Sequence, residues 1–429
     1  MKLGILGPLA VWMIVLVSIS AQAAAGPKVQ VLHSFAGGSD GYAPWANLTA
    51  DAAGNLYGTT VEGGSTEYCG GIGCGIVFEL IAPLSRNGVW KENVLYRFTG
   101  SADGAYPEAG LILDNQGNLY GTTQIGGIFD GLCLAGQTDL GCGVVFELSP
   151  NAGGAWTETV IHGFTGQNGD GAYPVANLIF DSSGNLYGTT DVSAGCPFSC
   201  ASLNGNGVVF ELTPNGSQNW TETILYQFDN GVDGAAPLAG LVFDPSGNLY
   251  GTTSTNGANE LGTVFELTPP ILQGGQWTIS TLYSFASSGV PRGGVIFDKA
   301  GNLYGTTSSS NGTVFELSPT GNGVWTESSL YAFGEGRTAT PYAGLVSDGS
   351  GNLYGTTLGK ICGCAFRMQN NNGNWKEAEL DFFTGQNGPC GPAAGLIFGK
   401  WGAVYGTSAS GGKCSIDPGG CGAVFGILP

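Results

Sequence analysis

A seven-residue phrase that recurs along the chain constrains the fold more than any other feature. The phrase Gly-Asn-Leu-Tyr-Gly-Thr-Thr occurs six times, and a seventh, degenerate copy reads Gly-Ala-Val-Tyr-Gly-Thr-Ser. The copies begin at Gly54, Gly117, Gly184, Gly247, Gly301, Gly351 and Gly402, at intervals of 50 to 67 residues. Repeats of this period indicate a solenoid, a propeller or a tandem array.

Each repeat unit contains four short segments that have the composition of β-strands. In the third unit these segments are 176–181, 185–190, 208–212 and 220–228, each rich in aromatic and branched residues and bounded by turn residues. An array of separate units would require each one to bury its own core, which is marginal at this size. We therefore predict an all-β, seven-bladed β-propeller with four antiparallel strands per blade.

The two ends of the repeat region carry complementary pieces of one blade. Residues 29–35 match the fourth segment of the other units, whereas residues 422–425 match the third segment. The last unit therefore lacks the strand that the N-terminal region has in excess. We predict that this N-terminal strand completes the last blade and closes the ring.

The repeat resembles a known family. The phrases Pro-x-Ala-Gly-Leu, Asp-x-x-Gly-Asn-Leu-Tyr-Gly-Thr-Thr and Gly-Thr-Val-Phe-Glu-Leu, followed by Trp-Thr-Glu and Leu-Tyr-x-Phe, cover residues 29–429. They resemble the GloVer (Gloeobacter/Verrucomicrobia-type) tandem repeat of exported bacterial proteins whose C-terminal anchor varies. The resemblance implies export and supports the fold, but it implies no biochemical activity. No anchor is recognisable here, which favours a soluble product.

Composition excludes several classes of protein. Glycine supplies 77 of 429 residues, only 10% of residues are charged and 11% are aromatic, so a disordered chain is not expected. The net charge of −19 and the 13 scattered basic residues argue against a nucleic-acid partner. Because the chain has only two histidines, we expect no metal, no cofactor and no histidine-based catalysis.

The N-terminal residues have the features of a secretory signal peptide. Lys2 precedes an apolar stretch, and a small-x-small site ends at Ala23. We predict a signal peptide over residues 1–23 and a single propeller domain over residues 24–429, with no insertion into a membrane after cleavage. The product is expected to be a monomer, either secreted or located in the periplasm or at the cell surface.

Residues that are constant among the units are expected to serve the blade itself. An aspartate before each Gly-Asn turn can accept hydrogen bonds from turn amides. The repeated tyrosines should pack between blades, the tryptophans should cover the outer strands, and the glutamates of the third segment should form structural hydrogen bonds. His33 and His162 occupy the position of Tyr96 and Tyr226 in sister units, so we interpret them as substitutes for tyrosine.

Most of the 11 cysteines fall in pairs within the longest loops, those between the second and third segments of units one, two, three and seven. Paired cysteines in an exported chain predict disulfides, although metal binding is an alternative. The predicted bridges are Cys69–Cys74, Cys133–Cys142, Cys196–Cys200, Cys414–Cys421 and Cys362–Cys390. Cys364 is expected to be a buried free thiol.

Function on a repeated scaffold is expected where the copies differ. The residue after the proline that leads into each inner strand should lie near the channel mouth, on the face that carries the long loops. In the seven units it is Trp45, Glu108, Val175, Leu238, Arg292, Tyr342 and Ala393. Aromatic rings with one acid and one base would suit a sugar or peptide ligand, although the position could also be simply unconstrained.

These patterns predict a non-catalytic protein that recognises a carbohydrate or an extracellular protein through its disulfide-stapled loop face. The candidate ligand-binding residues are Trp45, Tyr106, Tyr173, Tyr342, Glu108, Asp103, Asp170 and Arg292, and no catalytic residue is assigned. One alternative is a propeller lyase or hydrolase acting on a polysaccharide or small molecule. Another alternative is a purely structural surface or matrix protein, because the fold alone does not determine function.

Overall fold

The computed structural model describes residues 28–428 apart from short gaps. The gaps are 66–68, 130–132, 136–137, 194–205, 217–218, 230, 273, 287–288, 336–338, 372, 386–387 and 415. The predicted signal peptide lies outside the described residues. No helix within the described part of the chain is long and apolar enough to cross a membrane.

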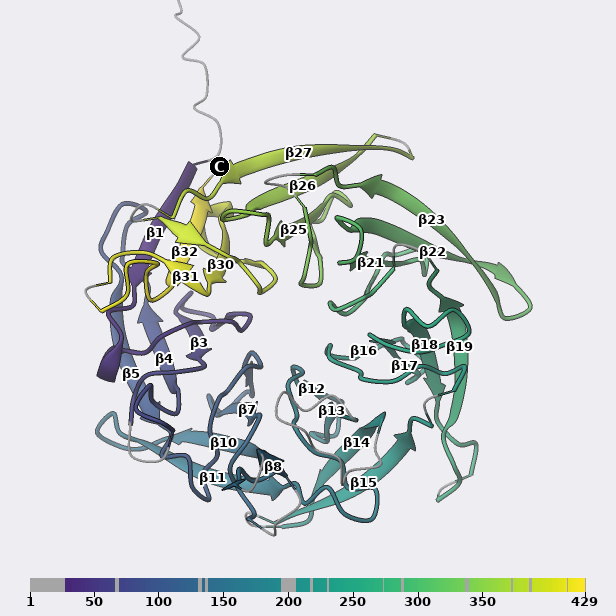
Figure 1. Cartoon of the computed structure of the whole chain (residues 1–429), viewed down its shortest axis with the longest axis horizontal. Coiled ribbons are helices and arrows are strands. Elements are labelled where there is room, and N and C mark those ends of the chain that lie inside the picture. The colour runs from purple at the N-terminus through teal and green to yellow at the C-terminus, as the bar shows by residue number, and fades with distance from the viewer. Residues whose placement is uncertain are drawn as a thin grey trace, which may run out of the picture.

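Seven four-stranded antiparallel sheets are arranged in a ring about a common centre (Figure 1). This is the predicted seven-bladed β-propeller. The first three blades consist of β2 (Thr49–Ala50), β3 (Leu56–Thr60), β4 (Ile76–Ile81) and β5 (Lys91–Arg97); β6 (Ile112–Leu113), β7 (Leu119–Thr123), β10 (Val144–Pro150) and β11 (Trp156–Gly163); and β12 (Ile179–Phe180), β13 (Leu186–Ser193), β14 (Asn206–Pro214) and β15 (Trp220–Gln227).

Blades four to six follow the same order from the inner to the outer strand. They consist of β16 (Val242–Phe243), β17 (Leu249–Thr253), β18 (Thr263–Thr268) and β19 (Thr278–Ser284); β20 (Ile296–Phe297), β21 (Leu303–Thr307), β22 (Thr313–Gly321) and β23 (Val324–Ala332); and β24 (Val346–Ser347), β25 (Leu353–Thr357), β26 (Cys364–Asn371) and β27 (Asn374–Phe382). The inner strands have only two residues each. In the third blade the inner strand is shorter than the predicted segment 176–181, because it pairs with the second strand only at Ile179 and Phe180.

The N-terminal strand completes the seventh blade, as predicted. This blade has the strand order β1 (Lys28–Ser34), β32 (Ala423–Leu428), β30 (Val404–Ser408) and β29 (Ile397–Phe398). β1 pairs antiparallel with β32, so Lys28 lies opposite Leu428. Small additional strands lie in the loops: β8 (Leu134–Ala135) pairs with β9 (Thr138–Asp139), and β28 (Pro389–Cys390) pairs with β31 (Ser410–Gly411).

A pair of phenylalanines joins the blades at every interface of the ring. One ring follows the outer strand of a blade, and the other lies on the third strand of the next blade. The pairs are Phe35–Phe78, Phe98–Phe146, Phe164–Phe210, Phe228–Phe265, Phe285–Phe315, Phe333–Phe366 and Phe383–Phe425, all packed edge to face with centroids 4.8–5.3 Å apart. The glycine of the repeated phrase makes room, because a Cβ at Gly188 would lie 2.5 Å from the Phe210 ring.

The repeated aspartate, tyrosine and glutamate form one hydrogen-bonded unit. The sequence predicted hydrogen bonds for the aspartate and the glutamate, but not for the tyrosine. In the third blade the backbone and side-chain amides of Asn185 donate to Asp181 at 2.9 and 2.8 Å. The Tyr187 hydroxyl lies 3.4 Å from Asp181 and 2.8 Å from Glu211. The bonds from asparagine and tyrosine to the turn aspartate recur in the first six blades. These residues therefore serve the scaffold.

Candidate functional site

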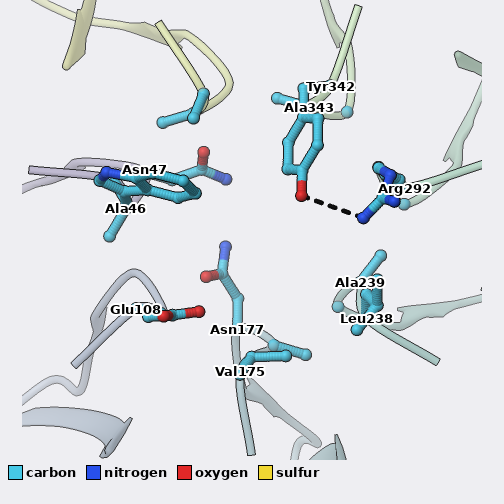
Figure 2. A pocket seen from close by; sticks show the side chains of 18 residues that line it. Ala46, Asn47, Glu108, Val175, Asn177, Leu238, Ala239, Arg292, Tyr342 and Ala343 are labelled. Carbon is cyan, nitrogen blue, oxygen red and sulfur yellow. Dashed lines mark hydrogen bonds between the residues drawn. The ribbon is translucent and has the colours of Figure 1, made fainter. Parts of the chain in front are cut away.

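A pocket of ≈180 Å³ lies where the seven inner segments converge on the channel. One divergent residue from each blade lines it, and these are the seven that follow the blade prolines: Trp45, Glu108, Val175, Leu238, Arg292, Tyr342 and Ala393. Figure 2 shows the labelled members of this set projecting toward a common centre from separate blades. The pocket is smaller than a usual small-molecule site of about 300–1,000 Å³, so it suits one small chemical unit.

The chain reaches the pocket through a repeated backbone turn. The residue before the proline has a left-handed backbone, with φ of +56° at Ala43, Tyr106 and Tyr173. Its amide donates to a cysteine carbonyl of the preceding blade, from Ala43 to Cys421 at 3.0 Å, from Tyr106 to Cys74 at 3.0 Å and from Tyr173 to Cys142 at 2.8 Å. Gly391 makes the same bond to Cys362 at 3.0 Å. The disulfide-bonded loops are thus coupled directly to the segments that carry the pocket residues.

Four of the expected disulfides lie within the described residues. They are Cys69–Cys74, Cys133–Cys142, Cys362–Cys390 and Cys414–Cys421. Cys364 is free and buried, as expected. The predicted bridge between Cys196 and Cys200 lies outside the described residues. The observed bridges fit an extracellular environment, because disulfides persist under oxidising conditions.

Threonines of the second strands hold the pocket lining from behind. The Thr407 hydroxyl donates to the carbonyl of Ala46 at 2.8 Å, and the Thr306 hydroxyl donates to that of Ala343 at 2.8 Å. Because each bond crosses from one blade to the next, the lining is fixed by the same contacts that hold the ring together. The pocket is therefore built on a rigid frame.

Arg292 and Tyr342 form a polar and aromatic pair on one side of the pocket (Figure 2). The guanidinium Nη1 donates to the Tyr342 hydroxyl at 3.0 Å, and its Cζ lies 5.0 Å from the centre of the tyrosine ring. This contact fixes the direction of both side chains while leaving further guanidinium N–H groups available to a ligand. The pair can therefore donate hydrogen bonds to hydroxyl or carboxylate oxygens.

Glu108 places a carboxyl group in the same pocket. Burial raises the pKa of Glu108 to about 7, with a smaller contribution from the nearby Asp191 carboxylate. Burial also raises the pKa of Asp191 to about 6, although the positive charge of Arg292 opposes the shift. At neutral pH the Glu108 carboxyl can therefore act either as a donor or as an acceptor of hydrogen bonds.

Trp45 supplies an exposed aromatic surface at the pocket, with 43% of the residue accessible to solvent. Beside it, the Asn47 side chain accepts a bond from the Gly395 amide at 2.6 Å, and Asn177 accepts one from the Gly110 amide at 2.6 Å. Sequence reasoning missed these two asparagines. The sequence did contain a signal, because asparagine replaces the glycine of the Pro-x-Ala-Gly-Leu phrase in units one and three.

The other candidate residues do not line the pocket. Tyr173 is only 6% exposed and lies in a hydrophobic cluster with Cys133 and Cys142, while Tyr106 packs against the cluster of Cys69 and Cys74. Because their left-handed backbones direct the rings toward the preceding blade, these tyrosines support the stapled loops.

The two loop aspartates also lie away from the pocket. Asp103 accepts bonds from the Thr99 amide at 2.8 Å and the Tyr96 hydroxyl at 3.1 Å. Asp170 accepts a bond from the Thr165 amide at 2.6 Å and lies 3.0 Å from His162 Nε2. Both carboxylates therefore fix their own loops. The structure brings together Trp45, Glu108, Arg292 and Tyr342 from the candidate set.

The fold and its repeated blades define a seven-bladed β-propeller with disulfides in its loops. The chain belongs to the Gloeobacter/Verrucomicrobia repeat family, whose model matches residues 18–194 and 131–311. A search of curated proteins finds no match to the sequence.

Solved structures support the fold at low sequence identity. A fungal alcohol oxidase of the AA5 family, in complex with copper, has a TM-score of 0.55 at 12% identity, covering 94% of this chain and 77% of that chain. A candidate 6-phosphogluconolactonase from Bacteroides fragilis has a TM-score of 0.52 at 14% identity, covering 83% of this chain and 89% of that chain. At this level of identity the likenesses show the propeller fold alone.

Proposed function

We propose that this protein binds a carbohydrate at the channel mouth and releases it unchanged. The observation that carries the proposal is the combination of the exposed Trp45 ring with the Arg292–Tyr342 pair and the Glu108 carboxyl in one pocket. The apolar face of a sugar ring packs on an aromatic side chain, while hydroxyl groups bond to charged and polar side chains. The four side chains provide both kinds of contact.

The size of the pocket narrows the class of ligand. Because its volume is ≈180 Å³, it suits a single sugar unit, such as the end of a glycan, better than an internal stretch of polysaccharide. The disulfide-bonded loops that abut this mouth would then contact the following units. Export, with cleavage of the predicted signal peptide, would place the pocket where extracellular glycans are available.

A glycan panel with matched variants tests the proposal. The oxidised protein is incubated with immobilised glycans, and the affinity of each retained glycan is measured by calorimetry. Trp45→Ala should weaken binding at least 10-fold. Phe398→Ala, which removes an aromatic residue with 40% exposure outside the pocket, should leave it unchanged. Equal binding by Trp45→Ala, or retention of no glycan, would contradict the proposal, and capture of a protein partner instead would favour protein recognition.

The second candidate function is a hydrolase or lyase acting on a glycan. The observation that favours it is the pKa of about 7 at Glu108, since a general acid works best when its pKa is near the working pH. Product analysis by chromatography in the same incubation separates the two functions. Released products that disappear with Glu108→Gln would establish the enzyme and contradict non-catalytic recognition.

A further inference from the structure

Two equivalent clusters of metal-ligating side chains lie at the outer edges of blade interfaces. Each combines a histidine of an outer strand, an aspartate of the loop that follows, and a glutamate from the outer strand of the next blade. The clusters are His33, Asp40 and Glu92, and His162, Asp170 and Glu222, with the ligand atoms of each cluster all within 4.8 Å of one another. The first cluster joins β1 to β5, and the second joins β11 to β15.

The distances suit a small divalent cation. His33 Nε2 lies 3.6 Å from Asp40 Oδ2, and His162 Nε2 lies 3.5 Å from Glu222 Oε1. Tetrahedral ligands at the zinc distances of about 2.0–2.2 Å are separated from one another by roughly 3.3–3.6 Å. The shorter distance of 3.0 Å from His162 to Asp170 is that of a hydrogen bond, and a small side-chain rotation would open it.

Several of the converging atoms are buried without a hydrogen-bond partner. In the first cluster these atoms are His33 Nε2 and Glu92 Oε1, and in the second the atom is Glu222 Oε1. The equivalent Glu158 Oε1 beside Tyr96 is also without a partner, so each such position has an acceptor for a cation and only the histidine is particular to the two clusters. A buried polar atom without a partner is costly, so its presence in a native structure needs an explanation. A cation at the centre of each cluster would satisfy these atoms together.

Each cluster also brings two carboxyl groups together in a half-buried place. The aspartate and glutamate oxygens of each cluster lie within 4.8 Å of one another, and the histidine nitrogen lies within the same distance of both. Two carboxylates facing each other favour the binding of a cation, since a cation relieves their repulsion.

Sister blades provide an internal comparison. The Tyr96 hydroxyl bonds to Asp103 at 3.1 Å and the Tyr226 hydroxyl bonds to Asp233 at 2.8 Å, so tyrosine and histidine hold the loop aspartate in similar ways. His162 therefore does substitute for tyrosine, as the sequence suggests. In addition, it brings an imidazole nitrogen, a good ligand for zinc and related ions, to a place where tyrosine offers only a neutral hydroxyl.

We propose that the two clusters are metal sites, each binding one divalent first-row transition ion, with zinc as the reference ion. One imidazole and two carboxylates supply three protein ligands and leave a fourth position for water. Each ion bridges two adjacent blades. The first lies at the joint where β1 closes the ring, and the second joins the second blade to the third. The sequence analysis predicted no metal site, because the sequence does not show that these residues of adjacent blades lie together.

Zinc titration of matched variants tests the proposal. The oxidised full chain is stripped with EDTA, dialysed without thiol reductant, and titrated with zinc chloride at pH 7 in a calorimeter. The wild type should bind two zinc ions per chain. His33→Tyr and His162→Tyr should each bind one, and the double variant should bind none. These substitutions reproduce the tyrosine of sister blades, so near-UV circular dichroism should remain as in the wild type.

A gain-of-site variant makes the test independent of any loss of folding. Tyr96→His places a histidine beside Asp103 and Glu158, the same set of residue types as in the second cluster. The variant should raise the number of bound zinc ions from two to three. A wild type that binds no zinc would overturn the proposal. So would a double variant that binds as many ions as the wild type.

Discussion

The body of the blades and the channel mouth differ in how closely the seven units repeat the same residues. In the body, the first six blades use the same aspartate, asparagine and tyrosine in the same hydrogen bonds, and all seven interfaces use a phenylalanine pair. At the mouth, seven equivalent positions carry seven different residues. The difference teaches that in a closed ring of repeats, the repeated residues maintain the ring and the divergent ones are free to serve a ligand.

The comparison has a physical basis. Every interface must meet the same geometry for the ring to close, so a change at one phenylalanine pair disturbs both adjoining blades. A side chain that projects into the channel meets no such requirement. Body substitutions should therefore reduce stability, whereas mouth substitutions should change ligand binding with little effect on stability.

The largest effect on stability is expected for Phe210→Ala. The Phe210 ring is completely buried, packs on Phe164 and lies over Gly188. Removing it should lower the free energy of unfolding by about 3–5 kcal/mol, because a cavity is left at an interface. Trp45→Ala should change it by no more than about 0.5 kcal/mol. Urea denaturation of both variants measures the contrast, and equal losses would break the distinction between body and mouth.

A smaller effect is expected for Asp298→Ala in the turn of the fifth blade. Burial raises the pKa of Asp298, but hydrogen bonds from the Asn302 amide and side chain outweigh it and hold the pKa below its usual value. The variant should lose about 2 kcal/mol at pH 7. The carboxylate stabilises the fold above the ordinary aspartate pKa, so the gap between the two proteins should shrink below about pH 4. A gap that stays constant with pH would contradict this explanation.

An effect of opposite sign, and smaller than those of the two body variants, is expected for Glu108→Gln at the mouth. The pKa of Glu108 rises to about 7 in the folded protein, so wild-type stability should fall as pH rises from about 4.5 to 7. The variant has no carboxyl group to ionise at this position. It should therefore be about 1 kcal/mol more stable than the wild type at pH 8, allowing for partial exposure. Thermal denaturation at pH 4 and pH 8 measures it. A destabilised variant at pH 8 would mean that Glu108 serves the scaffold.

The fold was predictable from the sequence because the number of repeats predicts the number of blades. Seven copies of one phrase predict seven blades, and the complementary ends at 29–35 and 422–425 predict the closure. The pairing of Cys362 with Cys390 followed from a cysteine placed just before the strand glycine, as in the other loops. Each of these inferences compares one unit with another and needs no three-dimensional information.

The candidate site was predictable only in part. Proline spacing placed Trp45 and Arg292 at the mouth, but the sequence did not show that Tyr106 and Tyr173 turn toward the disulfides, because a left-handed backbone before proline redirects the ring. Nor did it show the metal-ligand clusters, since His162 and Glu222 belong to different blades. Comparing the sequences of the units shows which residues are equivalent, but it does not show which residues of different units are in contact.

The pairing of β1 with β32 has a consequence for how the protein is made. β1 can pair with β32 only after residue 428 has been synthesised. The first strand therefore stays unpaired while the rest of the ring is made. Throughout that time the growing chain presents an unpaired strand edge, a feature prone to wrong association. The pairing of β1 with β32 is therefore also the step that removes this hazard, and a chain in which β32 has not yet been made remains an open arc.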